Sequence, residues 1–315
     1  MANVPKTIDQ TMMPFYRKSR IKVRTREALV GYLFLSPWLL GFLIFLLGPM
    51  LASIYLSMTD YKMLKPPVWI GLANYQRMFT DQFVYISLKV TVTFTFISVP
   101  LGLACALAVA VLLNQKIIAS GIFRTVFYLP SVISGVAVAM VFAWIFNYRF
   151  GILNYFLSFV GIEGPNWLGH PRWALWAFVL MSLWGIGGNV VIYLAALQGV
   201  PDSLHEAATI DGAGAWLRFW NITVPLITPV ILFTLVMGVI GTFQTFTQSY
   251  IMTGGGPAYA TLFYLLYLYR NAFNWFEMGY ASALAWLLFL IILFCTIILW
   301  STSARWVYYE GGERR

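Results

Sequence analysis

Residues 278–304 read MGYASALAWLLFLIILFCTIILWSTSA, and none of these 27 side chains carries a charge. A helix rises about 1.5 Å per residue and the hydrocarbon core of a bilayer is about 30 Å thick, so this run predicts a transmembrane helix. Working outward, five other runs without Lys, Arg, Asp or Glu are also long enough to span. They cover residues 28–59, 90–115, 125–148, 173–201 and 219–269.

The composition agrees with these runs. The 315 residues are 60% hydrophobic and 10% charged, whereas about 25% of an ordinary soluble domain is charged. No soluble fold could hide so much apolar surface from water, which excludes a soluble enzyme and a disordered chain. The two cysteines, Cys105 and Cys295, lie inside apolar runs and exclude a secreted disulfide scaffold.

The longest run, 219–269, could hold two helices, but Thr253-Gly254-Gly255-Gly256-Pro257 interrupts it, since glycine and proline end helices. We expect one span before this loop and a short helix outside the core after it, over 261–269. The sequence therefore predicts an all-α membrane domain over 28–302, between a basic segment at 1–27 and a tail at 303–315. The six predicted spans are 28–50, 84–113, 122–146, 173–197, 226–250 and 281–302.

The positions of Lys and Arg predict the orientation. With both termini in the cytoplasm, the inner segments hold 13 of the 20 basic residues, and seven of these lie before residue 27. The net charge of +9 is then an inner-leaflet signal and not a nucleic-acid footprint. Residues 17–24 anchor the topology or bind anionic lipid specifically. A cleaved signal peptide is disfavoured, because the first apolar run is too long.

The loop between the fourth and fifth spans, 200–225, lies inside by this topology. Ser203 followed by Glu206 predicts a capping box, and so a short helix from about Leu204. Asp211-Gly212 predicts its end, since glycine accepts the left-handed conformation that closes helices. A second helix is expected from about Ala213 to just before Pro225. Taken alone, this is either a capped connection or a docking element with small residues along its turn.

These residues resemble a known family. Glu206-Ala207-Ala208-x-x-Asp211-Gly212-Ala213, followed by Phe219, Ile222 and Pro225, is similar to the EAA loop of binding-protein-dependent ABC importer permeases. Val224 and Gly214 depart mildly from that pattern. The flanks resemble the carbohydrate-uptake branch, which includes maltose and glycerol-3-phosphate transporter permeases. The similar pieces are Gly151-Ile152-Leu153-Asn154, Ala195-x-Leu197-Gln198-x-Val200-Pro201, Phe243-Gln244-Thr245-Phe246, Thr253-Gly254-Gly255-Gly256-Pro257 and Gly279-Tyr280-Ala281-Ser282-Ala283.

The resemblance implies a type I ABC importer permease that pairs with a second permease, two ATP-binding cassette subunits and an external solute-binding protein. ATP and Mg would bind to the partner ATPase, and no cofactor or metal is expected in this chain, which has no G-x-x-x-x-G-K-[ST] phosphate loop. The coupling residues carried over are Glu206 as polar anchor, Ala207 and Ala208 for close docking, Asp211, Gly212 and Ala213 at the turn, and Pro225 at the start of span five.

Polar side chains within the spans are candidates for a substrate path, because such residues face the bundle or a cavity. Span four supplies Trp184, Asn189 and Tyr193, and span five supplies Gln244 and Gln248. Aromatic faces with amides and hydroxyls suit a carbohydrate, an oligosaccharide or related polyol. Each pair four residues apart, Asn189 with Tyr193 and Gln244 with Gln248, is expected to share a helix face. The alternative is hydrogen bonding between neighbouring helices.

The function predicted is therefore a non-catalytic permease subunit in a prokaryotic plasma membrane. A secondary transporter or channel for a small polar solute is the first alternative, and it should show internal repeats or broken helices. A membrane enzyme is the second. His170 and His205 are the only histidines and lie on opposite sides by this topology, so neither a metal site nor a catalytic histidine cluster is expected.

Overall fold

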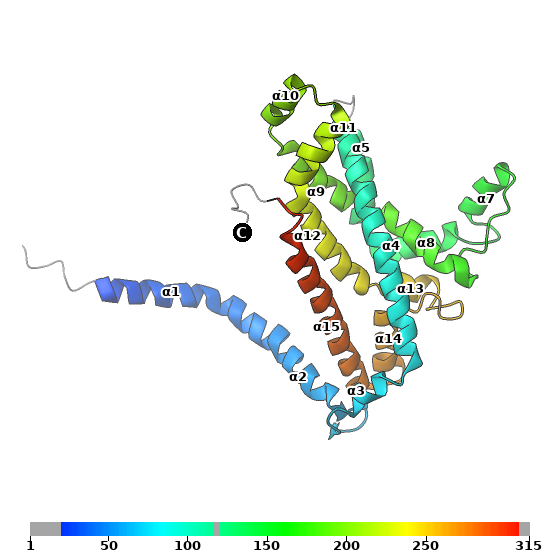
Figure 1. Cartoon of the computed structure of the whole chain (residues 1–315). Coiled ribbons are helices and arrows are strands. Elements are labelled where there is room, and N and C mark those ends of the chain that lie inside the picture. Colours follow the sequence, from blue (N-terminus) through cyan, green and yellow to red (C-terminus); the bar gives the residue numbers. More distant parts are fainter. Residues whose placement is uncertain (1–19, 116–119, 309–315) are drawn as a thin grey trace, which may run out of the picture. The chain divides into compact units, whose positions relative to one another are not determined.

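The computed structural model describes residues 20–115 and 120–308 and is mostly helical (Figure 1). It falls into two units, which meet between Tyr55 and Leu56. The first unit holds α1 (Arg20–Gly41), the π-helical η1 (Phe42–Leu47) and most of α2 (Gly48–Ser57). The second begins with β1 (Thr59–Asp60), β2 (Val68–Trp69), α3 (Ala73–Met78), α4 (Gln82–Leu113), α5 (Ser120–Val132), α6 (Gly135–Ile145), α7 (Ile152–Phe159), α8 (Pro171–Trp184) and α9 (Gly187–Gln198). It continues with α10 (Asp202–Ile210), α11 (Ala215–Arg218), η2 (Phe219–Thr223), α12 (Val224–Phe243), α13 (Thr247–Met252), α14 (Tyr264–Tyr269), η3 (Arg270–Asn274) and α15 (Met278–Ser303).

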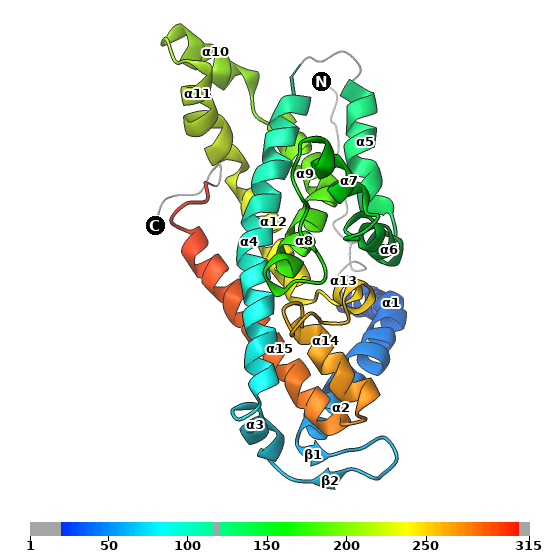
Figure 2. The same cartoon turned by 90° about the vertical axis from the view of Figure 1, so that its right-hand side faces the viewer.

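The second unit is a helical bundle built around α4. This helix contacts α8, α9, α12 and α14, and α15 packs on α12 and α14. Helix α4 runs along the bundle from the end near α3 toward the end near α10 (Figures 1 and 2). We call these the α3 end and the α10 end. Three apolar clusters form the core, centred on Leu284, Tyr193 and Phe178. The antiparallel pair β1–β2 lies at the α3 end.

The long apolar helices lie mainly in the uncharged runs of the sequence. Four are long and apolar enough to cross a membrane, and two further pairs reach that length only when each bent pair is taken as one span. These four segments are Glu27–Ser57, Gln82–Leu113, Ala215–Met252 and Met278–Ser303. Their positions agree with four of the six expected spans, while the count of six and the inward termini stay predictions.

The third and fourth expected spans are broken, where the sequence analysis expected single helices. The α5–α6 pair bends by 99° and the α8–α9 pair by 46°. Pro130 near the end of α5 removes a backbone donor and crowds the preceding turn. Gly187 begins α9 against α5, and a Cβ there would overlap the Phe127 carbonyl. This glycine therefore serves close helix packing.

The fifth expected span, 226–250, is also interrupted. Helix α12 ends at Phe243 and α13 begins at Thr247. The short helix expected after this loop is α14, which packs within the bundle and contributes the fully buried Tyr264 and Leu266; its place outside the hydrocarbon core stays a prediction. The backbone N–H of Tyr264 donates to Thr91 Oγ1 of α4 at 2.9 Å. Because Thr91 lies nine residues past the start of α4, about 14 Å along it, the chain re-enters the bundle at this point.

Several expectations concern residues outside this description. The basic segment 1–27 is described only from Arg20, where α1 already begins, and the tail 303–315 only as far as Tyr308. Residues 116–119, which include the inner cation Lys116, also lie outside the described residues.

Candidate functional site

The first part of the candidate site is the short helix α10. It begins at Asp202, directly after Pro201, whose φ of −62° and ψ of 127° set the turn into it. Ser203 therefore lies inside the first turn, and no side chain caps this helix. The expected capping box between Ser203 and Glu206 is wrong, because the proline moved the start two residues upstream and removed Ser203 from the capping position.

The end of α10 is as predicted. Gly212 has a φ of +81°, and its N–H donates to Thr209 O at 3.1 Å while the Ala213 N–H donates to Ala208 O at 2.8 Å. This pair of bonds is a Schellman motif, which only a residue tolerant of positive φ closes at low cost. The turn leaves Glu206, Ala207 and Asp211 exposed and Ala208 and Ala213 half-buried. Residues 206–213 of the predicted coupling loop thus form one accessible turn, which we call the knuckle.

The chain after α10 differs from expectation. Helix α11, η2 and α12 follow one another without a break, so no helix stops before Pro225. The turn ahead of Pro225 is π-helical, with the Val224 N–H on Phe219 O. A wider turn relieves the clash that a proline makes with the carbonyl four residues before it. Pro225 therefore lies within a continuous helix that joins α10 to the bundle.

The second part of the candidate site is a half-open cavity of about 320 Å³ lined by residues of α4, α5, α6, α8, α12 and α13. It lies where the three helix breaks converge: α5 to α6, α8 to α9, and α12 to α13. Non-helical backbone at membrane depth is tolerated where it lines such a cavity. No charged side chain lines it. The lining residues are Phe94, Pro130, Ser131, Ile133, Gly135, Val138, Phe178, Met181, Ser182, Trp184, Gly185, Gly241, Thr242, Thr245 and Gln248.

The predicted path residues divide into two groups. Trp184 and Gln248 line the cavity, whereas Gln244, Asn189 and Tyr193 do not. Gln244 is the exposed cap of α12, so the helix ends there and the shared face expected with Gln248 does not exist. Tyr193 is buried and its hydroxyl lies 2.7 Å from Thr234 Oγ1 of α12, which is the interhelical hydrogen bond of the alternative interpretation. Asn189 is half-buried on the same helix.

Several lining residues were missed by the sequence analysis. Ser131, Ser182 and Thr242 bring hydroxyls to the cavity. Each of these residues lies within three positions of Pro130, Gly185 or Gly241. That proximity was the available signal, because glycine and proline inside an apolar run mark the helix breaks that line a cavity.

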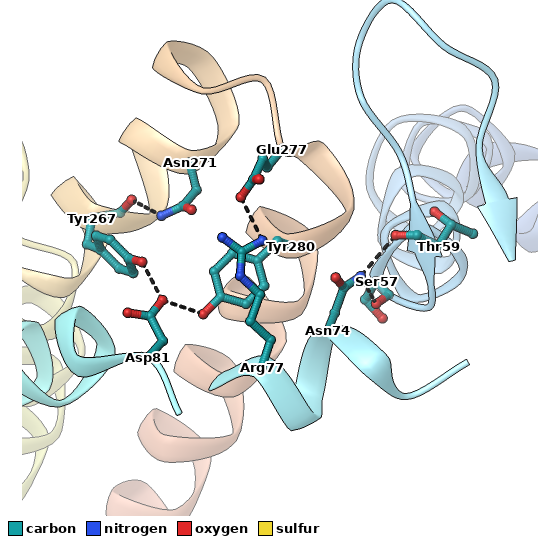
Figure 3. Close-up of polar contacts among 9 residues, drawn as sticks. All are labelled: Ser57, Thr59, Asn74, Arg77, Asp81, Tyr267, Asn271, Glu277 and Tyr280. Carbon is teal, nitrogen blue, oxygen red and sulfur yellow. Dashed lines mark hydrogen bonds and ion pairs between the residues drawn. The ribbon is translucent and has the colours of Figure 1, made fainter. Parts of the chain in front are cut away.

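A polar cluster at the α3 end also escaped the sequence analysis (Figure 3). Asp81 caps α4 by accepting the Phe83 N–H at 2.9 Å, and its second carboxylate oxygen accepts the hydroxyls of Tyr267 and Tyr280. Arg77 pairs with Glu277 at 2.8 Å, and its guanidinium lies 4.0 Å from the centre of the Tyr280 ring. The cluster joins α3, α4, α14 and α15, and it fixes the end opposite α10.

Potential metal-binding side chains are dispersed in the part of the chain that the structure describes. No group of three or more His, Cys, Asp or Glu side chains could hold a metal ion among residues 20–115 and 120–308. His170 caps α8 by accepting the Arg172 N–H on Nδ1 at 3.2 Å, so it has a structural role.

Comparison with known proteins decides the family. Residues 98–307 match the binding-protein-dependent transport system inner membrane component family. The chain belongs to this family. Its relatives are ABC transporter permeases, which confirms the predicted non-catalytic permease component and disfavours both the enzyme and the secondary-transporter alternatives. The broken helices noted above are thus a feature of a permease of this family.

Two relatives and one solved structure illustrate the similarity. The chain is 47% identical to a probable ABC transporter permease, YesP, of Bacillus subtilis, over 91% of this chain and 94% of the relative. It is 34% identical to the trehalose/maltose transport system permease MalF of Thermococcus litoralis, over 88% and 94%. A bacterial ABC transporter involved in the import of alginate superposes with a TM-score of 0.79 at 25% identity, over 91% of this chain and 99% of the other.

Proposed function

We propose that this permease carries a carbohydrate, an oligosaccharide or related polyol, through the cavity at the three helix breaks. It would act with a second permease, two ATPase subunits that bind ATP and Mg, and an external solute-binding protein. It would span a prokaryotic plasma membrane with the α10 end in the cytoplasm. The relatives named for trehalose and maltose and for alginate support the substrate class.

The observation that carries the proposal is the chemistry of the cavity. Its lining combines the indole of Trp184, hydroxyls such as Thr245 and the amide of Gln248, with no charged group. Carbohydrate hydroxyls need hydrogen-bond partners once they leave water, and the apolar face of a sugar ring packs on an aromatic side chain. A neutral lining of this kind offers both without burying an ion in the membrane.

Energy coupling would run through α10. The ATPase can shift the permease between inward and outward states only if it holds the docked loop differently in each state. The exposed residues of the knuckle suit such docking, because the small side chain of Ala207 permits close approach and Glu206 is accessible as a polar anchor. The continuous helix from Ala215 to Phe243 leads from this knuckle to the third break, at the cavity wall.

The test uses two glutamines that the structure separates. The importer is reconstituted in liposomes with its binding protein and offered labelled oligosaccharides, beginning with maltose and trehalose. Gln248→Leu should lower uptake at subsaturating sugar about tenfold, the cost of one unsatisfied polar partner. Gln244→Leu, the same change four residues away and outside the cavity, should leave uptake near wild type. Equal uptake by both variants would exclude Gln248 from the path, and no sugar uptake by the wild type would exclude the carbohydrate assignment.

A further inference from the structure

A second cavity, of about 320 Å³, lies between α10 and the end of α4 and is separate from the proposed sugar path. The polar residues in its lining come from three segments that are far apart in sequence. They are Asn114 and Gln115 after α4, His205 of α10, and Arg218 and Thr223 before α12. No acidic side chain lines it, although α10 itself carries Asp202 and Glu206. Its lining is therefore cationic and rich in donors.

Arg218 is the centre of this cavity. Its Nη1 donates to Thr209 Oγ1 and to the His205 carbonyl, which fixes the guanidinium against α10. Its Nε is buried and has no hydrogen-bond partner. Arg77 and Glu277 form an ion pair at the α3 end. Among the described residues, no carboxylate forms an ion pair with Arg218. A half-buried cation without a counter-charge is costly, and an anion beside the guanidinium in the cavity would lower that electrostatic cost.

We propose that this cavity binds a phosphate group, either the headgroup phosphate of an anionic lipid or free phosphate. Arginine presents N–H donors in a planar fork that matches phosphate oxygens, and the imidazole of His205 and the amides of Asn114 and Gln115 add further donors. A water molecule occupies about 30 Å³ of liquid, so the cavity has room for a phosphate group and several waters.

The surroundings fit a membrane interface. Trp216 is 74% exposed and Trp220 51% exposed on the helix that carries Arg218. Exposed indoles of this kind gather at the level of lipid headgroups. The lipid source rests on the proposed orientation, with the α10 end at the inner leaflet. A phosphate bound here would tie α10 to the end of α4 and so set the position of the knuckle that the ATPase is proposed to engage.

The experiment measures binding and not transport, so its failure is distinct from failure of the proposed sugar path. The assembled importer is placed in nanodiscs of phosphatidylcholine alone, of phosphatidylcholine with phosphatidylglycerol, and of phosphatidylcholine with added inorganic phosphate. Its Tm and the phosphatidylglycerol retained in native mass spectrometry are measured. Arg218→Gln is compared with Arg305→Gln, an exposed arginine that does not line the cavity.

We expect phosphatidylglycerol to raise the Tm of the wild type and of Arg305→Gln. Arg218→Gln should bind at least about tenfold more weakly, the factor expected for one lost hydrogen bond to a charged group. The same pattern with inorganic phosphate alone would assign free phosphate as the source.

Three results would overturn the proposal. The first is that neither probe raises the Tm. The second is that both variants lose binding equally. The third is that Arg218→Gln loses the ATPase without any phosphate effect, which would place this cation in a protein interface. If Arg218→Gln does not assemble, His205→Asn decides alone, and unchanged binding of both probes in it would contradict the site.

Discussion

At the scale of single residues, Gly279 shows how tightly the α3 end is packed. It lies at the start of α15, and its N–H donates to Tyr61 O at 3.0 Å. A Cβ at this position would overlap the Thr59 carbonyl oxygen. The glycine of the Gly279-Tyr280-Ala281 piece is thus required by the close approach of the β1 segment, and the next residue, Tyr280, then reaches Asp81.

Gly279→Ala should therefore destabilise the protein. Overpacking against backbone costs about 1–3 kcal/mol, because backbone moves less readily than a side-chain end. Thermal unfolding in detergent is the measurement, with Gly121→Ala as the control, since nothing lies within 4 Å of a Cβ at that helical position. An unchanged Tm for Gly279→Ala, or an equal loss in Gly121→Ala, would contradict the close approach.

At the scale of elements, α10 carries the coupling prediction. Its start could not be read correctly, because the capping-box pattern and Pro201 compete for the same turn and the proline determined the result. Its end could be predicted, because glycine readily adopts the left-handed conformation that closes a helix, and Gly212 adopts it here. Local chemistry therefore predicted the turn that presents Glu206 and Ala207, and it failed where two local signals conflicted.

Gly212→Val should reduce coupled uptake while the protein remains assembled in the membrane. A β-branched residue strongly resists the φ of +81° found here, so the knuckle must rearrange. Gly214→Val is the matched control, because Gly214 has a φ of −67° and nothing lies within 4 Å of its Cβ. Binding-protein-stimulated ATPase activity and uptake are measured together. Wild-type coupling in Gly212→Val, with the control also normal, would remove this turn from the coupling mechanism.

The broken helices mark the limit of sequence reasoning about elements. Charge-free runs located every long helix, because an unpaired charge is excluded from the bilayer whatever the tertiary structure. They could not show that the run 125–148 turns by 99° near Pro130, since a proline in an apolar run either kinks the helix or is accommodated. The cavity followed from three such breaks meeting in space. It was therefore only half anticipated, through Trp184 and Gln248.

At the scale of the whole molecule, long-range contacts were the least predictable. The bonds from Tyr267 and Tyr280 to Asp81 join residues more than 180 positions apart, and no local pattern in the sequence signals them. The mostly helical membrane architecture and the family could be inferred from spacing and motif, while the count of six spans stays a prediction. The helix face expected to be shared by Gln244 and Gln248 was wrong because it depended on where a helix ends.

The assembly supplies the whole-molecule prediction. A tagged copy of this chain, extracted in mild detergent, should co-purify with a second permease and an ATPase, since the chain has no phosphate loop of its own. Mass spectrometry of the isolated complex is the measurement, and an unrelated tagged membrane protein from the same cells is the control. Recovery of an active homo-oligomer free of both partners would contradict the proposed importer.

The buried position of α14 has a consequence for how the protein is made. Residues 264–274 are too few to be recognised as a spanning helix during membrane insertion. The Tyr264 backbone N–H donates to α4 and its hydroxyl donates to α15, while the Asn271 amide donates to the Tyr267 carbonyl within the same segment. The translocon can therefore deliver α4 and α15 by hydropathy alone, whereas this segment must be seated afterwards by the finished helices. Biogenesis would then end with a step of tertiary folding against the inserted helices, after the polypeptide has left the ribosome.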